Sequence, residues 1–464
     1  MGLRSAPTRS AQTPGPLRRL REAYYGWWIL AAAVVGMAVG NGIAFSSFGL
    51  FVEPLEAQFA WARAEVSLGF SISLGVSGLS APLVGRLIDR FGTRPCILAG
   101  APLTAASYLL IATTGALWQW YVFLAINAVV RGAIFYIPFQ VLIARWFSRR
   151  RATAIAILGA GLWSGSVVMV PVMQVVIDAV EWDGAFIFSG MLIAVLFVPL
   201  GLFVIRDSPP ADAWELQPAS ENRTRNPVAA GRSLTLRQAV RTPTFWIITL
   251  AMMTFFYGVV GWLVHAVPYY ESVGLSTGWA AGLVSLASAL AIVALLIYGR
   301  YADRIERVER PAAIFTASLA VSMLILLVSG GATWGIALFI VFFVLGFAGG
   351  PLLEPLLLTR AFGLGSFATI LGAMFMLETS GLVVAPAVAG WIFDATDSYD
   401  WALVMFAISA GLSVVMFLLA SRMARPLEGA RPPSGSMPVI ARVAGQAGAR
   451  APSYDRSEPG QSRG

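Results

Sequence analysis

Four ionisable side chains lie inside long apolar stretches of this sequence: Arg131, His265, Glu354 and Glu378. An ionisable group at the centre of a bilayer costs about 2.5–3.5 kcal/mol on insertion scales, so each one needs a compensating use. A buried guanidinium can hold a carboxylate through two parallel hydrogen bonds. Buried carboxyls can carry protons, as can a histidine, whose ordinary pKa is about 6.5. These residue types could therefore bind an organic anion and move protons with it.

Arg131 is predicted to anchor the carboxylate of a substrate. It lies near the middle of its apolar stretch, and Asn127 lies one helical turn earlier on the same face. Planar donors held in a low-dielectric cavity suit a carboxylate. The alternative is a structural ion pair with an acid such as Glu378. We therefore predict that Arg131 and Asn127 bind substrate.

The other three ionisable residues are assigned to proton movement, substrate contact or gating. Glu378 lies near the middle of its stretch, where a carboxyl can serve as a proton carrier. His265, the only histidine, lies toward the outer end of its stretch and could relay protons or contact substrate. A hydrogen-bonded structural histidine is the alternative. Glu354 lies close to the inner end of its stretch, which favours a gate or a structural contact.

Four further polar or aromatic residues lie at a similar depth. They could line a cavity for a small organic anion with an apolar body. Packing or lipid-facing aromatic residues are the usual alternative. The four residues are Asn41, Tyr136, Trp163 and Tyr257.

The composition indicates a membrane protein. Mean hydropathy is +0.75 and charged residues make up 12% of the 464-residue chain, against about 25% in soluble domains. About 20 apolar residues can cross a bilayer as a helix, so we predict an all-α membrane protein with twelve transmembrane helices. The twelve apolar stretches are 26–50, 64–86, 95–114, 118–143, 151–179, 184–206, 244–270, 277–301, 311–329, 333–359, 366–394 and 400–423.

These stretches fall into two groups of six. The segment between the groups is polar, contains several prolines and has no apolar periodicity, so it is predicted to be a linker. Both tails are rich in proline, glycine, serine and arginine, a composition that cannot bury enough surface to fold alone. The predicted organisation is a disordered cytoplasmic tail at 1–22, a six-helix bundle at 23–206, a cytoplasmic linker at 207–243, a second six-helix bundle at 244–425 and a disordered cytoplasmic tail at 426–464.

The arginines predict the orientation in the membrane. The basic residues are all arginines, and in the short loops they gather on one side, whereas the segments on the other side hold only Arg63 and many acids. The positive-inside rule places both termini in the cytoplasm, and we predict a multi-pass protein of the cytoplasmic (inner) membrane. The net charge of +8 is then a topology signal and does not indicate nucleic-acid binding.

A short charged phrase occurs twice in the chain. Its copies are GRLIDR at 85–90 and GRYADR at 299–304, and each copy ends the second apolar stretch of its half. Such a repeat in an apolar chain predicts two similar halves, an architecture of many secondary transporters.

The twelve predicted helices and the first copy resemble the major facilitator superfamily. The phrase Gly85-x-x-x-Asp89-Arg90-x-Gly92-x-Arg94 is similar to its signature after helix 2. The resemblance implies that the aspartate and the arginines brace helix ends and exchange partners as two bundles rock. The second copy departs from the pattern, with Glu306 in place of the later glycine. The expected gating residues are Gly85, Asp89, Arg90, Arg94, Asp303, Arg304 and Glu354.

Further phrases resemble the monocarboxylate transporter branch and its bacterial relatives, including oxalate and formate exchangers. Mammalian-type members carry a lysine in helix 1 and an aspartate and an arginine in helix 8, but 44–49 and 277–298 contain no such charge here. The proton and carboxylate pair of those members is therefore not carried over. The similar phrases are Tyr25-Gly26-Trp27-Trp28, Arg145 to Ala152, His265-x-x-Pro268-Tyr269 and Gly390-Trp391-Ile392-Phe393-Asp394.

We predict a secondary active transporter that moves a small organic anion, a monocarboxylate, by alternating access coupled to protons or to anion exchange. The alternative is a proton-coupled exporter of amphipathic drugs or metabolites. From other classes, an intramembrane protease using Ser77 and His265 and a nontransporting sensor are weaker hypotheses. The sequence has no metal-binding or phosphate-cradling motif, so no metal, cofactor or enzymatic activity is expected. The expected partners are the anion, protons and the lipid bilayer, and a monomer is expected.

Overall fold

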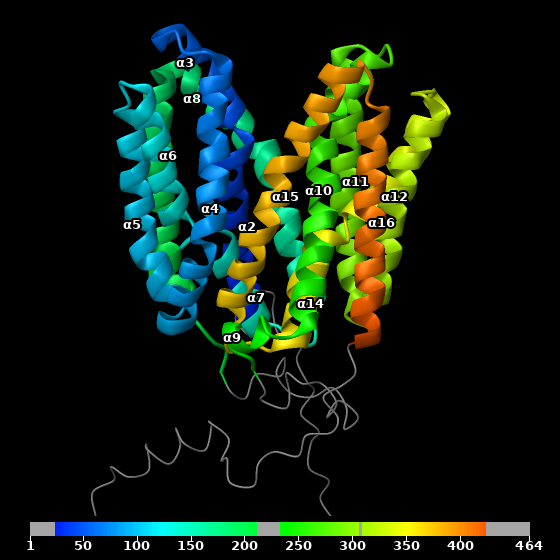
Figure 1. Ribbon diagram of the computed structural model, residues 1–464. Helices are drawn as coiled ribbons and strands as arrows, with labels where there is room; N and C mark the ends of the chain where they lie inside the picture. Colours follow the sequence, from blue (N-terminus) through cyan, green and yellow to red (C-terminus); the bar gives the residue numbers. More distant parts are fainter. Residues whose placement is uncertain (1–23, 211–232, 306–308, 424–464) are drawn as a thin grey trace, which may run out of the picture.

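The computed structural model describes residues 24–210, 233–305 and 309–423, which form helices joined by short turns and contain no strand. The predicted tails at 1–22 and 426–464, and most of the predicted linker, lie outside these residues. Figure 1 shows two groups of helices side by side. The first bundle consists of α2 (Gly26–Asn41), α3 (Val52–Phe59), α4 (Arg63–Phe91), α5 (Thr93–Ala112), α6 (Leu117–Arg131), α7 (Tyr136–Trp146) and α8 (Arg151–Pro199). After the short helix α9 (Leu236–Ala239), the second bundle consists of α10 (Pro243–Ser272), α11 (Thr277–Ala302), α12 (Glu309–Ser329), α13 (Thr333–Phe347), α14 (Gly350–Phe362), α15 (Phe367–Thr396) and α16 (Asp400–Met423).

The described residues contain 11 candidate membrane spans. One of them, Arg151–Val204, is 54 residues long. A continuous helix of that length would measure about 80 Å, far more than the bilayer core of about 30 Å. The backbone leaves the helical region at Val180 and at Glu181, where φ is +63°. The prediction of an all-helical membrane protein is confirmed.

Two candidate spans are interrupted near their middle. The sequence predicts an unbroken helix at 118–143, but the structure breaks it between Arg131, the last residue of α6, and Tyr136, the first of α7. Gly132 lowers the helix propensity there, and Pro138 has no amide to donate to a carbonyl in the preceding turn. The other broken span consists of α13 and α14, which are separated by Ala348 and Gly349.

Helix α2 also changes its geometry toward its C-terminal end. After Asn41 it continues as a π-helical turn, η1 (Gly42–Ser46), followed by a 3₁₀ turn, η2 (Phe48–Phe51). A second π-helical turn, η3 (Leu200–Val204), follows α8. Such turns shift the register of the helix and often occur at functional sites.

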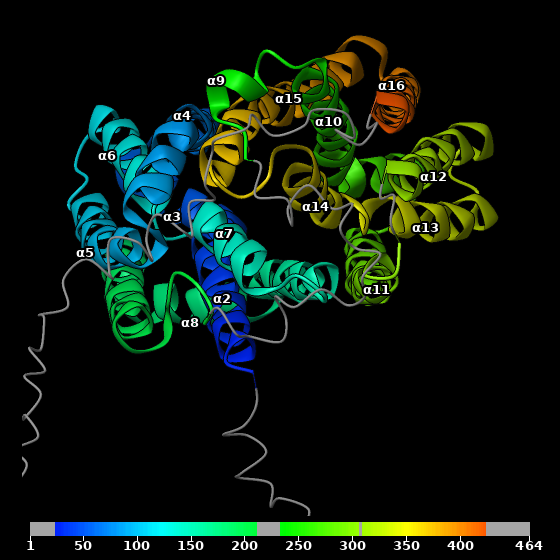
Figure 2. The ribbon, with the colours of Figure 1, turned by 90° about the horizontal axis from the view of Figure 1, so that it is seen from below.

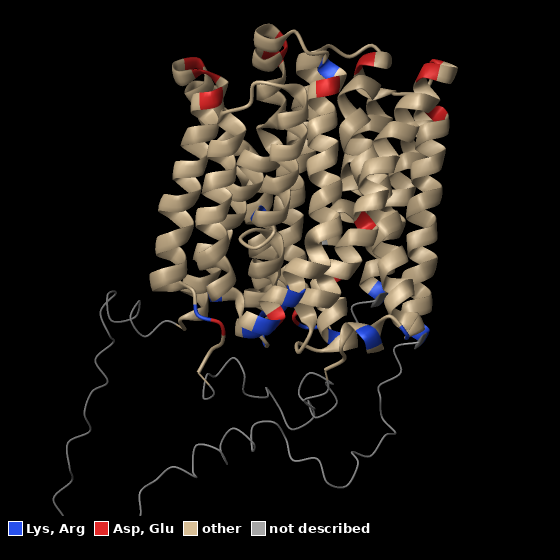
Figure 3. Ribbon diagram, turned by 60° about the vertical axis from the view of Figure 1, so that its left-hand side comes forward, with Lys and Arg blue, Asp and Glu red and all other residues tan. Residues whose placement is uncertain are grey.

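Charges separate to the two ends of the molecule, as Figure 3 shows. We call the end that holds the repeated GR..DR phrases the arginine-rich end and the opposite one the acidic end. By their places at helix ends and turns, the arginine-rich end includes Arg86, Arg90, Arg94, Arg145, Arg149, Arg150, Arg300 and Arg304, and the acidic end includes Glu53, Glu56, Glu65, Asp178, Glu181, Asp183, Glu271, Asp394, Asp397 and Asp400.

The two bundles meet toward the arginine-rich end and diverge toward the acidic end (Figure 1). Figure 2 shows this contact from the arginine-rich side, where α7 and α14 lie between the outer helices of the two bundles. Small residues permit the close approach. A Cβ on Gly372 of α15 would lie 2.3 Å from the carbonyl oxygen of Ala81 on α4.

Candidate functional site

Arg131 is a buried cation at a helix interruption. Only 5% of it is exposed, and its guanidinium carbon lies 4.9 Å from the centroid of the Phe45 ring. The guanidinium also interacts with the hydroxyl of Tyr108 on α5. No carboxylate in the described residues forms an ion pair with Arg131, so the predicted alternative of a pair with Glu378 is not formed. An uncompensated buried charge is costly, and a guanidinium can bind an anion through paired donors.

The two predicted asparagines join helices of the first bundle. The Asn127 side-chain amide donates to the Ser107 hydroxyl over 2.9 Å and is 2% exposed. It therefore points toward α5, beside the tyrosine that contacts Arg131. The Asn41 amide donates to the carbonyl of Leu162 on α8 over 3.0 Å. The structure thus places both asparagines in contacts between helices of the first bundle.

Two of the three predicted aromatic residues lie where the bundles meet. Trp163 on α8 packs edge-on against Phe347 on α13, with 5.1 Å between ring centroids. The ring of Tyr136 on α7 stacks on Phe375 of α15 with 6.0 Å between centroids. Tyr257 instead lies within the second bundle, where its hydroxyl contacts a methionine sulfur on α16.

Glu354 on α14 and Glu378 on α15 form one buried cluster with Tyr136. Each glutamate is 1% exposed, and the two carboxyls are near enough to interact electrostatically. The Tyr136 hydroxyl donates to Glu354 Oε2 over 3.2 Å, across the bundles. The sequence assigns these residues separately to gating, proton coupling and substrate binding, whereas the structure brings them together.

His265 has both ring nitrogens bonded inside the second bundle. Nε2 lies 2.9 Å from the carbonyl oxygen of Pro386, so Nε2 carries the hydrogen and donates. Nδ1 then accepts from the Tyr399 hydroxyl over 3.3 Å. This geometry matches the structural alternative for His265 and ties α10 to α15 near the acidic end.

Asp89, at the end of α4, binds the first turn of α15 in the other bundle. Its Oδ2 accepts from the amide and the hydroxyl of Thr369 over 2.8 and 2.6 Å, and its Oδ1 accepts from the amide of Ala368 over 3.3 Å. The first amides of a helix have no partner within the helix, and the helix dipole is positive there. A carboxylate at this position therefore satisfies free donors and the dipole together. We call this contact the Asp89 latch.

Asp303, at the end of α11, makes the matching contact with the first turn of α8. Its carboxylate accepts from the Ala152 amide over 2.8 Å and from the amide and hydroxyl of Thr153 over 3.2 and 2.5 Å. We call this contact the Asp303 latch. In the Asp89 latch the first bundle supplies the aspartate and the second supplies the donors, and in the Asp303 latch these roles are reversed. In both latches the donors are two backbone amides and a threonine hydroxyl.

The glycine of each phrase lets the latch helices touch. A Cβ on Gly85 would lie 2.2 Å from the carbonyl oxygen of Ala368, and one on Gly299 would lie 2.3 Å from the Cβ of Ala156. Real Cβ atoms do not approach other atoms so closely, and the backbone at Ala368 cannot swing aside as a side chain can. Gly85 is therefore part of the latch through close packing.

The arginines of the phrases contribute differently. Arg94 donates through Nε and Nη2 to the carbonyls of Gly201 and Leu202 over 2.9 and 2.8 Å, which ties α5 to the end of the first bundle. Arg90 and Arg304 are exposed at the arginine-rich end. Among the charged residues of the two phrases, the hydrogen bonds described between the bundles come from the aspartates.

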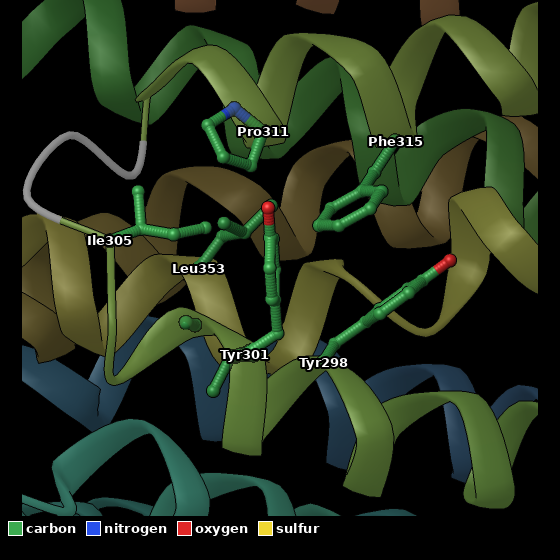
Figure 4. Close-up of a pocket in the computed structure, with 8 residues that line it drawn as sticks. Tyr298, Tyr301, Ile305, Pro311, Phe315 and Leu353 are labelled. Carbon is green, nitrogen blue, oxygen red and sulfur yellow. The ribbon is translucent and has the colours of Figure 1, made fainter.

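A small apolar pocket lies elsewhere, in the second bundle near its arginine-rich end. Figure 4 shows its lining, in which the rings of Tyr298 and Phe315 lie face to face with 4.2 Å between centroids. Its lining residues carry no charge, and none of the predicted site residues is among them. We therefore place the candidate site at Arg131 and at the contact between the bundles.

Residues 33–379, more than half of the chain, match the family model described as Major Facilitator Superfamily. The chain belongs to this superfamily. The predicted membership is confirmed.

Within the superfamily, this major facilitator protein is similar to transporters of one branch. It is similar to human monocarboxylate transporter 11, with 27% identity over 406 residues that cover 85% of this chain and 83% of the relative. It is also similar to the oxalate:formate antiporter of Oxalobacter formigenes, with 23% identity over 408 residues that cover 87% and 93%. The predicted resemblance to this branch is confirmed.

Solved structures agree on the fold of this major facilitator protein. The E. coli fucose:proton symporter superposes with a TM-score of 0.63 at 13% identity, covering 85% of this chain and 99% of that chain. A proton:xylose symporter superposes with a TM-score of 0.61 at 18% identity, covering 86% and 95%.

The sequence prediction missed the threonines of both latches, although the chain contains a signal for them. Ala152-Thr153 and Ala368-Thr369 are the second and third residues of α8 and α15. The same dipeptide therefore stands at the same place in two helices, each facing a repeated aspartate. Phe45 and Tyr108, which contact Arg131, follow no such repeat.

Proposed function

We propose that this major facilitator protein is a secondary active transporter that moves a small organic anion, a monocarboxylate, across the cytoplasmic membrane by alternating access. The single observation that carries the proposal is Arg131, a buried guanidinium without an acid partner among the described residues. A guanidinium offers paired donors that match a carboxylate. The relatives named as monocarboxylate transporters and as an oxalate:formate antiporter point to the same class of substrate.

We propose twelve membrane crossings with both termini in the cytoplasm. The long candidate span Arg151–Val204 supplies two of them, separated at Val180 and Glu181. The two bundles then correspond to 23–206 and 244–425, joined by a linker at 207–243. The positive-inside rule assigns the arginine-rich end to the cytoplasm, so the structure is closed toward the cytoplasm. No cofactor, metal or enzymatic activity is required, and a monomer contains the whole site.

The latches give alternating access its mechanical basis. Both join helix ends of opposite bundles at the arginine-rich end, so opening toward the cytoplasm must break both sets of hydrogen bonds. Hydrogen bonds to a charged group contribute about 1.5–3 kcal/mol each, so the latches favour the state that is open to the outside. Substrate binding would then need to offset this difference before the bundles rock.

The surroundings of Arg131 favour a substrate with a small apolar body. Phe45 lies against the guanidinium and also stacks on Phe135, with 6.1 Å between ring centroids. Both rings are half-buried. An anion seated on Arg131 would thus meet aromatic surface beside its carboxylate, as expected of a mostly apolar site with few polar groups.

The alternative function is a proton-coupled exporter of amphipathic drugs or metabolites. Buried acids, which would suit a cationic drug, are present at Glu354 and Glu378. They lie at the contact between the bundles, whereas the buried cation Arg131 better fits an anion. Both functions use coupling to protons or to a second solute.

Uptake into proteoliposomes tests the proposal. The solutes are radiolabelled lactate, benzoate, oxalate and the lipophilic cation tetraphenylphosphonium, with protein-free liposomes as the control. We expect uptake of a monocarboxylate that is saturable and inhibited by other carboxylates. Saturable transport of the cation alone would contradict the proposal and favour the exporter.

A further inference from the structure

The cluster at Glu354 and Glu378 has more polar groups than its contacts use. Oε1 of each glutamate is buried and has no hydrogen-bond partner among the described residues. The same holds for Oε1 of Gln140, which is 2% exposed and lies beside the Tyr136 hydroxyl on α7. Buried polar atoms are normally bonded, and each exception needs an explanation. Three such oxygens around one tyrosine indicate a polar site that can accept further hydrogen bonds.

Both carboxyls are buried, so placing a charge on both at once would be unfavourable. Like charges in a shared dry site oppose ionisation of the second group, and the pair then titrates as one unit. The Tyr136 hydroxyl donates to Glu354 Oε2 and supports a charge there. Glu378 receives no such bond in the described part of the chain, so no hydrogen-bond donor stabilises a charge there.

Among the described residues, no positive group forms an ion pair with either glutamate. Between Glu65 and Arg86, the part of α4 that packs on α15 has no ionisable residue. Tyr257 on α10 is the nearest titratable group on that helix, since it lies beside Gly381, one turn beyond Glu378. The remaining charged or titratable groups described on the packed elements lie toward helix ends or at the break in α8: Arg63, Glu65, Arg86, Asp89, Arg90, Arg145, Arg151, Asp178, Glu181, Asp183, Arg237, His265, Tyr269, Tyr270, Glu271, Arg310, Arg360, Asp394, Asp400 and Arg422.

We infer that Glu354 and Glu378 together form a shared proton site whose occupancy is tied to the contact between the bundles through Tyr136. The inference deepens the proposed function and rests on it, because it assigns the coupling ion of the same transport cycle. With the bundles in contact, one proton lies on Glu378 and the Tyr136 hydroxyl bonds Glu354. When the bundles part at the arginine-rich end, Tyr136 leaves with α7, water reaches both carboxyls, and the proton passes to that water.

Two assays on the same proteoliposomes separate coupling from binding. The first measures accumulation of the best carboxylate substrate under an imposed pH difference, and the second measures exchange of labelled for unlabelled substrate at equal pH. One proton per anion gives about ten-fold accumulation for each pH unit. We expect Glu378→Gln to keep exchange. Under the imposed pH difference, however, this variant should not raise the substrate concentration inside the liposomes above that outside. Glu378→Asp, which keeps the carboxyl, should restore accumulation.

Glu354→Gln is the second variant and keeps the test decisive if Glu378→Gln does not fold. It should also lower accumulation more than exchange, because the pair loses one of its two acids. Glu53→Gln, at an exposed acid of the acidic end, is the matched control and should behave as wild type in both assays.

Three results would overturn the shared site. The first is accumulation by Glu378→Gln equal to that of wild type. The second is wild-type accumulation that does not change with the pH difference. The third is accumulation driven by a sodium gradient at equal pH. Absence of any carboxylate exchange by wild type would instead contradict the proposed function itself. The two failures are therefore distinguishable.

Discussion

Arg131→Gln is expected to abolish high-affinity binding of the carboxylate substrate. Removing one partner of a buried, hydrogen-bonded charge pair costs about 2–5 kcal/mol, which corresponds to an increase in Kd of roughly 30-fold to several thousand-fold. The glutamine keeps hydrogen-bonding atoms near Tyr108 but loses the charge and the paired donors. Isothermal calorimetry or ligand-dependent unfolding of the purified protein measures the change.

Arg131→Lys is the matched control for the charge alone. Lysine keeps the positive charge but cannot bond a carboxylate with two parallel donors, so we expect intermediate affinity. Asn127→Asp offers a second control, because a carboxylate one turn away would supply Arg131 with an internal partner. That variant should also bind substrate weakly. Wild-type affinity in Arg131→Gln would remove the main support for the anion site.

Asp89→Asn combined with Asp303→Asn is expected to open the arginine-rich end. Each change removes the charge that accepts from two amides and a threonine hydroxyl. If the pair of changes removes about 3 kcal/mol, the equilibrium shifts about 100-fold toward the state with separated bundles. Each single variant should give a part of this shift, because the two latches hold different helix pairs.

A buried cysteine at the contact between the bundles reports the opening. Thr379 is 3% exposed and lies against Gly78 of the first bundle, so Thr379→Cys is alkylated only when the bundles part. The lone native cysteine is first removed by Cys96→Ala. We expect much faster alkylation in the double aspartate variant. An unchanged rate would show that the latches do not hold the closed end.

A bulky side chain at Gly85 should separate the bundles without any change to the aspartates, and the same alkylation assay measures its effect. Gly85→Val would push α4 from the backbone of Ala368, whereas a Cβ on Gly75, on the same helix, would have no atom within 4 Å. Gly75→Val is therefore the matched control. We expect faster alkylation of Thr379→Cys with the first substitution and little change with the second.

The sequence predicted the fold through features that are local in the chain. Long apolar stretches, arginine-rich turns and the repeated phrase each follow from a short segment, and so all-helical membrane architecture could be predicted. The interruption at Arg131 could not, because Gly132 and Pro138 are tolerated inside many membrane helices. Its effect depends on the neighbours that satisfy the freed backbone.

The candidate residues could be named one by one from the sequence, but their grouping in space could not. Arg131 and Glu378 are conspicuous because charges are rare inside apolar stretches. That Tyr136 bonds Glu354 depends on how two distant helices pack, which no spacing in the chain records. His265 was equally conspicuous, yet its partners Pro386 and Tyr399 come from other segments and match a structural role.

The most direct test of the central claim is thermal unfolding of the purified wild-type protein with matched acids and amides. Propionate, lactate and benzoate are each compared with propionamide, lactamide and benzamide, which have nearly the same shape but no charge. A ligand at 100 times its Kd stabilises the native state by about 2.7 kcal/mol. If Arg131 binds a carboxylate, at least one acid raises the unfolding temperature and its amide does not. Equal stabilisation by each acid and its amide would contradict the account.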